Sequence, residues 1–220
     1  MILRKERKVI IITGKSGTGK TKLSREIIKL FRRKIILDIL DEYTDGIVFY
    51  SMKDFVNNVS VIDENINIIL RSFREKDIND VCEWCLIAGN VLLTIEEFEN
   101  YVSRYDSFPK LDEIIRRGRH NDVSLLAVSQ RVPDFPPLFR SQITSFFSFF
   151  QDEPIDIKHL LSRGFILEDI EELERCEGLN LPIENKHYLC QGENYIQIME
   201  WINHGKQKNI LRQNTEAFQI

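Results

Sequence analysis

The chain has 220 residues and a mass of 26.0 kDa, with 43% hydrophobic and 29% charged residues. These fractions are typical of one soluble globular domain and exclude a disordered, collagen-like or repeat-built protein. No apolar stretch approaches the roughly 20 residues that cross a bilayer, so we expect no transmembrane segment. The N-terminal MILRKERKVIIITGKSG has too short an apolar run for a secretory signal, and we expect an intracellular, cytoplasmic protein.

Charge is distributed unevenly along the chain. The formal net charge is −4, yet residues 1–34 hold twelve Lys and Arg residues against two Glu. A basic end indicates an anionic partner such as a nucleotide or a nucleic acid. Because the pI of the whole chain is 5.7, a protein that coats DNA over its entire surface is excluded. Any contact with DNA is expected to be local, as in a lysine-lined pore.

Strand and helix patterns alternate along the chain, beginning with the buried-strand pattern KVIIIT at 8–13. After a Gly-rich turn, a helix over 20–33 is predicted by an apolar stripe formed by Leu23, Ile27, Leu30 and Phe31. The same half of the chain predicts strands at 35–40, 46–51 and 67–70, a short helix at 53–58 and a longer helix at 78–88.

The C-terminal half continues this alternation. Strands are predicted at 91–95, 123–129 and 145–150, helices at 111–119, 155–162 and 167–176, and a closing hairpin around Gly192 from 186–190 and 195–199. Alternating strands and helices imply an α/β fold, with a mostly parallel sheet covered by helices on both faces. We expect a single domain over 1–203 and a polar C-terminal tail at 204–220.

The strongest chemical signal is the run Gly14-Lys15-Ser16-Gly17-Thr18-Gly19-Lys20-Thr21, which fits the P-loop pattern G-x-x-x-x-G-K-[ST]. Glycines let successive backbone N–H groups point at phosphate oxygens, and the following helix adds the positive end of its dipole. Lys20 is predicted to contact the β and γ phosphates of ATP, and the Thr21 hydroxyl to bind Mg²⁺. The buried strand before the run and the amphipathic helix after it favour this interpretation over a chance Gly-rich turn.

A second motif, VLLTIEE at 91–97, ends an apolar strand with two carboxylates. Glu96 is predicted to hold Mg²⁺ through its water shell, and Glu97 to polarise the attacking water as a general base. Aspartate is commoner at the first of these positions. The alternative interpretation is a solvated helix start, because Glu also favours first turns.

A third motif, RRGRHNDVSLLAVSQRVP at 116–133, leads from a basic helix end into a buried strand that ends in Gln130. Ligands of open α/β sheets bind at the carboxyl ends of the strands, so Gln130 is predicted to lie near the γ-phosphate. An arginine from such a cluster can reach a phosphate held by a neighbouring subunit. The alternative is a cationic helix end that interacts only with the helix dipole.

Together these motifs resemble the HerA–FtsK superfamily of DNA-pumping ATPases. The resemblance covers about residues 8–150 and rests on GKSGTGKT, LLTIEE and RRGRHNDVSLLAVSQRVPDFPPLFRSQ. Val132 separates the SQR triplet from Pro133, where the family has [ST]-Q-R-P. Because of its small size, the chain is most similar to the compact genome-packaging ATPases of tailless, membrane-containing icosahedral viruses.

The resemblance implies a P-loop NTPase fold of the RecA-like (ASCE) type with ATP and Mg²⁺ as cofactors. It implies a homo-oligomeric ring, expected to be a hexamer, that threads double-stranded DNA without sequence preference into a preformed capsid. Capsid or vertex proteins would be partners, and the protein would act in the host cytoplasm or at the virion vertex. By position, Glu96 and Glu97 take the Walker B roles and Gln130 the sensor role. The arginine finger is assigned to Arg119, with Arg117 and Arg140 as alternatives.

Other functions stay open. A cellular HerA-like DNA pump would carry the same motifs and act in the cytoplasm. A nucleotide or small-molecule kinase is also a P-loop enzyme, and RRGRH could imitate its Arg-rich lid. A non-catalytic assembly protein would bind ATP without turnover, which the Glu pair disfavours.

Cys82 and Cys85 form a C-x-x-C pair without a second close pair, so a zinc site would need Cys176, Cys190 or a His. Their helical spacing with apolar neighbours favours a buried helix face over metal or redox use. The Phe-rich strand at 145–150 is likewise expected to be core.

Overall fold

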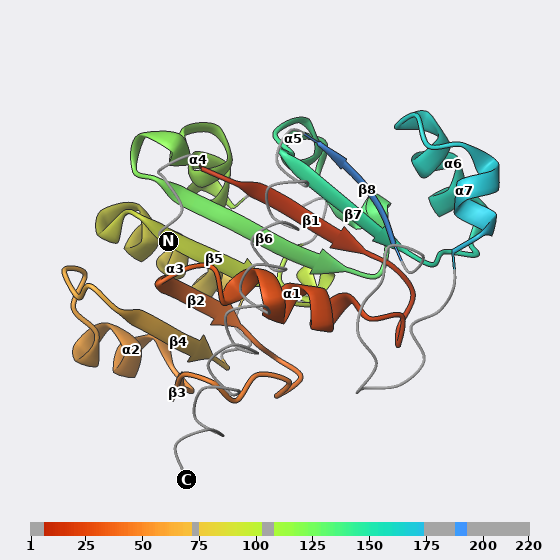
Figure 1. The fold of residues 1–220 in the computed structure, drawn as a ribbon. Helices are drawn as coiled ribbons and strands as arrows, with labels where there is room; N and C mark the ends of the chain where they lie inside the picture. The colour runs from red at the N-terminus through yellow and green to blue at the C-terminus, as the bar shows by residue number, and fades with distance from the viewer. Residues whose placement is uncertain (1–6, 72–74, 103–107, 174–187, 193–220) are drawn as a thin grey trace, which may run out of the picture.

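The computed structural model describes residues 7–71, 75–102, 108–173 and 188–192. Within these ranges eight strands form one sheet in the order β3-β4-β2-β5-β6-β1-β7-β8 (Figure 1). Neighbouring strands are parallel, except that β8 is antiparallel to β7. The predicted α/β fold with a mostly parallel sheet is therefore confirmed. The strands are β1 (Val9–Thr13), β2 (Arg33–Leu37), β3 (Ile47–Phe49), β4 (Ile66–Leu70), β5 (Val91–Ile95), β6 (Val123–Ser129), β7 (Ser145–Phe149) and β8 (Tyr188–Gly192).

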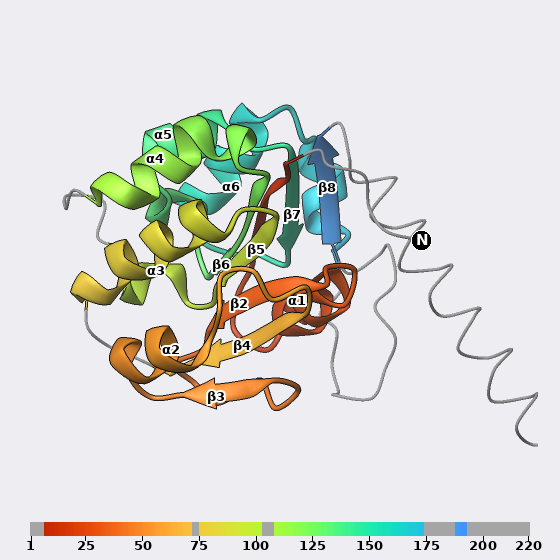
Figure 2. The ribbon, with the colours of Figure 1, turned by 90° about the vertical axis from the view of Figure 1, so that its left-hand side faces the viewer.

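Helices lie on both faces of the sheet (Figure 2). On one face α1 (Lys20–Ile28) packs against the sheet. The other face carries α2 (Met52–Asn58), α3 (Glu75–Ala88), α4 (Pro109–Arg117), α5 (Pro137–Ser141), α6 (Pro154–Ser162) and α7 (Leu167–Glu171). Three short 3₁₀ turns, η1 (Phe98–Asn100), η2 (Gly118–His120) and η3 (Val132–Asp134), complete the connections.

The core is divided by the sheet into two clusters. Alternate residues of a strand point to opposite faces, so Ile10 and Ile12 of β1 pack on the α1 side, whereas Val9 and Ile11 pack on the other. All five residues of β1 and of β5 are buried, and so are all seven of β6. The strands that carry the three motifs are therefore rigid central elements.

An aromatic group supports the segment that follows β5. Phe98 of η1 lies 4.9 Å from Phe135 and 5.3 Å from Phe139, measured between ring centroids, and all three side chains are fully buried. This packing anchors the turn that carries Glu96 and Glu97 beneath the carboxyl edge of the sheet.

Several boundaries differ from the sequence-based prediction. The first helix ends at Ile28, and Arg33 instead begins β2, where its guanidinium donates to the carbonyl oxygens of Val61, Ala88 and Gly89. The predicted strand 35–40 is shifted to Arg33–Leu37, because the Asp38 carboxylate accepts backbone N–H groups of a following turn. Helix α5 was not predicted.

The C-terminal part is described only in pieces. The predicted strand 186–190 appears as β8, whose last residue, Gly192, pairs with Ser145 of β7. Helix α7 ends at Glu171, earlier than predicted. Residue 176, the second hairpin strand at 195–199 and the predicted tail at 204–220 lie outside the described residues.

Cys82 and Cys85 are fully buried on α3 among the apolar side chains of the larger cluster, as the core interpretation predicts. Burial raises the pKa of the Cys82 thiol well above its usual value. Phe146, Phe147 and Phe149 are core residues of β7. Within the described ranges, no helix combines the length and apolar character needed to cross a bilayer.

Candidate functional site

The loop between β1 and α1 has the backbone geometry of a phosphate cradle. Gly14 has φ of +147°, and a Cβ at this position would lie 2.6 Å from Cβ of Phe149 on β7. Gly19 has φ of +108° and caps the N-terminus of α1 without a side chain. Both positions therefore require glycine. All eight residues of the predicted ATP-binding run lie in this loop or in the first turn of α1.

Hydrogen bonds within the loop hold it in shape. The Lys15 N–H donates to the Phe150 carbonyl at 3.0 Å, and the Thr18 hydroxyl donates to the Lys15 carbonyl at 2.7 Å. Lys20 is buried, and its Nζ donates to the same carbonyl at 3.1 Å. Ser16 and Gly17, at the tip, are exposed. The loop thus presents a buried ammonium and exposed backbone, which is the donor set that a polyphosphate needs.

Glu96, which follows β5, is almost fully buried beside α1. Its Oε1 accepts hydrogen bonds from the Ser24 hydroxyl at 2.6 Å and from the Tyr43 hydroxyl. Burial raises the pKa of Glu96 to about 7, opposed by these two donors and increased further by Glu42 and Glu97. Glu96 was predicted to hold Mg²⁺ through water, and the structure places its carboxyl beside Ser24, one helical turn beyond Thr21.

The Thr21 hydroxyl meets a different carboxylate. It donates to Oε2 of Glu42 at 2.9 Å. Glu42 comes from the segment after β2, whose neighbour in the sheet is β5. Neither Glu42 nor Tyr43 was singled out in the sequence. The signal that could have found them is an acidic run, LDILDEY, at the end of a predicted parallel strand, since such strand ends meet at one edge.

Glu97 and Glu99 form a second acidic group. Glu97 has a left-handed backbone, with φ of +48° and ψ of +57°, an uncommon conformation for a non-glycine residue. Burial raises the pKa of Glu99 to about 7, and the neighbouring Glu97 carboxyl adds to this, while a contact with the Ser129 hydroxyl opposes it. Glu99 was also missed, because its position inside the turn after the strand follows no recognised pattern.

Gln130 and Arg131 follow β6 at the same edge. Thr13 pairs with Ser129, so Gln130 lies beside the first residue of the P-loop. Gln130 is exposed, and its backbone carbonyl accepts a hydrogen bond from the Gln151 side-chain amide at 3.0 Å. Arg131 pairs through Nε with the fully buried Asp156 at 3.0 Å. The structure therefore brings the predicted sensor to the P-loop.

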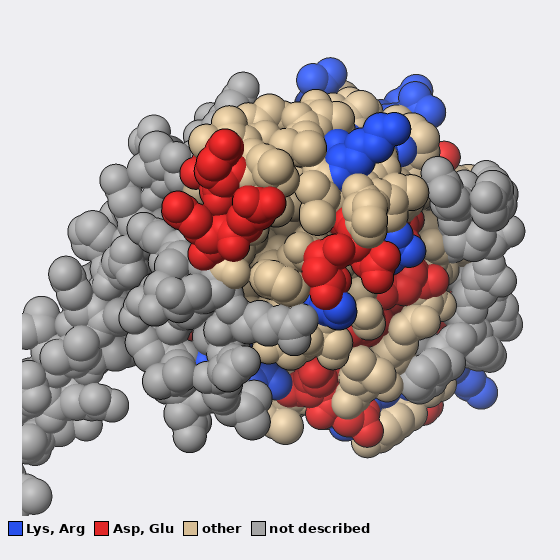
Figure 3. Space-filling view, turned by 90° about the vertical axis from the view of Figure 1, so that its right-hand side faces the viewer, with Lys and Arg blue, Asp and Glu red and all other residues tan. Residues whose placement is uncertain are grey.

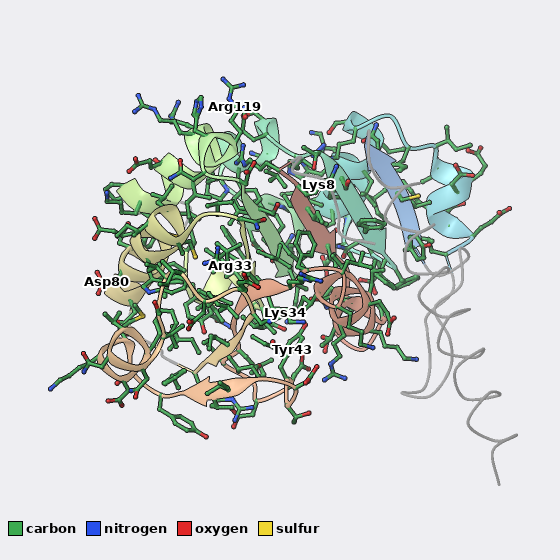
Figure 4. All side chains as sticks on the ribbon, turned by 60° about the vertical axis from the view of Figure 1, so that its left-hand side comes forward. Lys8, Arg33, Lys34, Tyr43, Asp80 and Arg119 are labelled. Carbon is green, nitrogen blue, oxygen red and sulfur yellow. The ribbon has the colours of Figure 1, made fainter. Side chains whose placement is uncertain are left out.

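The predicted finger, Arg119, lies elsewhere. It is exposed on η2, before the first residue of β6, whereas the P-loop follows the last residue of β1. The seven residues of β6 separate these two edges by roughly 20 Å. Figure 4 shows Arg119 at one end of the molecule, far from Tyr43. Arg117 ends α4 and Arg140 lies on α5, where it lines a pocket of about 220 Å³ with Arg163 and His159.

The donor set fits a magnesium ion. Mg²⁺ prefers oxygen ligands, usually one or two protein groups with water and substrate phosphate completing the shell. A hydroxyl (Thr21), a carboxylate in contact with it (Glu42) and a buried carboxylate one helical turn away (Glu96) are of this kind. The arrangement thus offers oxygen ligands to a metal bound beside the P-loop.

The fold is that of a P-loop NTPase. A buried central strand of a mainly parallel sheet leads through a glycine-rich loop into a helix that packs on one face of the sheet. No protein-family model and no curated protein matches the chain. Solved structures do. The genome packaging NTPase B204 from Sulfolobus turreted icosahedral virus 2, in complex with ATPγS, has a TM-score of 0.65 at 18% identity over 85% of this chain and 93% of that chain.

The same protein with sulfate gives 0.65 at 19% identity, covering 86% of this chain and 92% of that chain. B204 from Sulfolobus turreted icosahedral virus, a DNA-packaging ATPase, gives 0.55 at 19% identity, covering 78% and 90%. At these identities the likeness shows the fold. The resemblance stated from the sequence motifs is therefore confirmed as a resemblance of fold.

Proposed function

We propose that the chain is an ATPase that assembles into a homo-oligomeric ring and drives double-stranded DNA into a viral capsid. One observation carries this proposal: Glu96, Glu97 and Gln130 lie around the P-loop at the carboxyl edge of the sheet. The likeness to B204, a genome packaging NTPase, supports packaging over the alternatives, since it extends over 93% of the B204 chain. The setting would be the host cytoplasm or the virion vertex.

The residues of the site divide the work of hydrolysis. Lys20 binds the β and γ phosphates, and the backbone of residues 14–19 wraps them. When bound, Mg²⁺, held by Thr21 and through water by Glu96, supplies positive charge that neutralises the phosphate oxygens. Glu97 orients the attacking water and takes its proton, and Gln130 reports whether the γ-phosphate is present.

Arg119 can act only on a nucleotide bound by another copy of the chain. The length of β6 keeps it from its own P-loop, but it is exposed and available to a neighbour. An arginine finger in trans stabilises charge that develops in the transition state. A finger in trans requires each nucleotide to lie at a subunit boundary, which a ring provides.

DNA would be held locally through its backbone phosphates. On the face that Figure 3 shows, acidic side chains lie across the surface, while basic ones lie at the upper end and are scattered among the acidic groups and along the lower edge. Such a surface does not attract DNA uniformly. Binding through a few phosphates is independent of sequence and weakens steeply with salt.

The test is ATP hydrolysis by the purified chain with and without duplex DNA. We expect DNA to stimulate hydrolysis and Lys20→Ala to abolish it, by at least about 10²-fold. Lys29→Ala removes an exposed lysine that caps the C-terminus of the same helix and should keep wild-type activity. Hydrolysis indifferent to DNA would count against translocation. Phosphate transfer to a small-molecule acceptor in preference to water would identify a kinase instead.

A further inference from the structure

The segment from Asp38 to Tyr43, after β2, delivers two side chains to the P-loop helix that none of the three motifs contains. Glu42 accepts the hydrogen bond of the Thr21 hydroxyl, and Tyr43 donates to Glu96. Each of the two residues predicted to hold the metal is therefore contacted by a residue of this segment.

The direction of the Thr21 hydrogen bond suits a metal ligand. A hydroxyl binds a cation through a lone pair on its oxygen, so its proton must be donated to another acceptor. That acceptor is Glu42, at 2.9 Å. Glu96 accepts through Oε1 from Ser24 and Tyr43 instead. The carboxylate in contact with Thr21 is therefore that of Glu42, in the segment that follows β2, and not that of Glu96, which follows β5.

The segment is held so that these side chains are presented in fixed positions. The Asp38 carboxylate, 1% exposed, accepts the backbone N–H of Glu42 at 3.1 Å and of Tyr43 at 2.9 Å. Arg71, which follows β4, donates to the Tyr43 carbonyl at 2.8 Å and pairs with Asp41 at 2.7 Å. The turn is therefore tied to two neighbouring strands.

The carboxyl groups at the site outnumber the ammonium group, which favours binding of a cation. The carboxyl groups of Glu42, Glu96, Glu97 and Glu99 all interact electrostatically with the Lys20 ammonium. One ammonium thus faces four carboxyl groups. The guanidinium of Arg25 donates to the Glu42 backbone carbonyl and lies over the Tyr43 ring, 5.4 Å from its centroid.

We propose that Glu42 is an acidic group of the magnesium site, fixing the Thr21 hydroxyl and the water shell of the metal, and that Tyr43 is a positioning residue for Glu96. The inference rests on the proposed function only in that the chain binds ATP with Mg²⁺. It does not depend on DNA or on assembly into a ring.

The test for Glu42 is nucleotide binding without DNA. A fluorescent ATPγS analogue is bound to the full chain while Mg²⁺ is titrated into an EDTA-treated sample. Glu42→Gln should raise the Mg²⁺ concentration for half-maximal binding by about tenfold or more, and leave metal-free nucleotide affinity unchanged. Glu64→Gln, at an exposed position, is the matched control and should behave as wild type.

A Glu42→Gln midpoint within twofold of wild type would overturn the role of Glu42 and leave the proposed function standing. If the wild type binds Mg²⁺ with nucleotide but shows no DNA-stimulated hydrolysis, the proposed function fails alone. If the wild type shows no metal-dependent nucleotide binding, both fail.

The test for Tyr43 separates positioning from folding. Tyr43→Phe removes only the hydroxyl and keeps the buried ring. Because Glu96 is proposed to hold the metal through water, we expect the Mg²⁺ concentration for half-maximal binding of the ATPγS analogue to rise about threefold or more, with metal-free nucleotide affinity unchanged. Tyr50→Phe, at a side chain that is 70% exposed, is the control. A Mg²⁺ midpoint equal to that of the wild type, or an equal loss of nucleotide affinity with and without Mg²⁺, would refute the positioning role.

Discussion

Replacing Glu96 by Gln should change how the stability of the metal-free protein depends on pH. The native pKa of Glu96 is raised to about 7, chiefly because burial penalises the carboxylate, against an ordinary value of 4.5. Between these two values the native state binds a proton that the unfolded state has lost. The free energy of unfolding of the wild type therefore falls as pH rises from about 4.5 to about 7.

The size of this effect follows from the shift. Each pKa unit corresponds to about 1.4 kcal/mol, so the full shift corresponds to about 3 kcal/mol at pH 8. Gln cannot ionise, so Glu96→Gln should gain about 2.5 kcal/mol relative to the wild type between pH 5 and pH 8, because part of the shift is already expressed at pH 5. Glu99, whose pKa is also about 7, contributes to both proteins and largely cancels in the comparison.

Urea unfolding in EDTA at several pH values between 5 and 8 measures the two profiles. Glu64→Gln, an exposed control, should parallel the wild type. If Glu96→Gln loses stability with rising pH as steeply as the wild type, Glu96 is not the buried carboxyl that titrates, and the electrostatic picture of the site is wrong.

Further predictions follow from the loop, the core and the subunit boundary. Gly14→Ala places a Cβ 2.6 Å from that of Phe149 and should cost about 3 kcal/mol in urea unfolding, whereas Gly17→Ala, with no atom within 4 Å, should cost about 1 kcal/mol for its left-handed backbone. Phe135→Ala should lower the free energy of unfolding by about 3–5 kcal/mol, since it empties a fully buried aromatic contact. Arg119→Ala and Lys20→Ala should each abolish hydrolysis alone, yet regain part of it when mixed; a mixture that stays inactive would contradict a finger in trans.

The sequence predicted the centre of the fold better than its margins. The bounds of β5 and β6 agree with the predicted 91–95 and 123–129, because strands buried on both faces are continuous apolar runs. Strand β2 begins with Arg33 and Lys34, which no apolar pattern marks as strand. Arg33 is accommodated there because three carbonyl oxygens receive its guanidinium, a contact that only the folded chain creates.

Part of the candidate site could likewise be predicted from the sequence, and part could not. The P-loop could be predicted because its residues are contiguous and their spacing reflects phosphate chemistry. The contacts of Glu42 and Glu99 could not be predicted in this way, because they depend on the strand order β2-β5-β6-β1; the acidic run LDILDEY marks a strand end but does not say which strand lies beside it. The sequence also did not show where Arg119 lies. Because it precedes β6, Arg119 lies at the amino edge of the sheet, opposite the carboxyl edge that carries the P-loop.

The strand order also gives a physical reason for glutamate, in place of the commoner aspartate, at residue 96. The Thr21 hydroxyl already has a carboxylate partner in Glu42, from the neighbouring strand end. Glu96 is directed one turn further along α1, where Ser24 and Tyr43 donate to it. A shorter side chain would draw the carboxyl back from both donors and leave it buried without partners, which costs free energy. The longer stem and the Glu42 contact are therefore two parts of one arrangement, in which adjacent strand ends share the acidic side of the metal site.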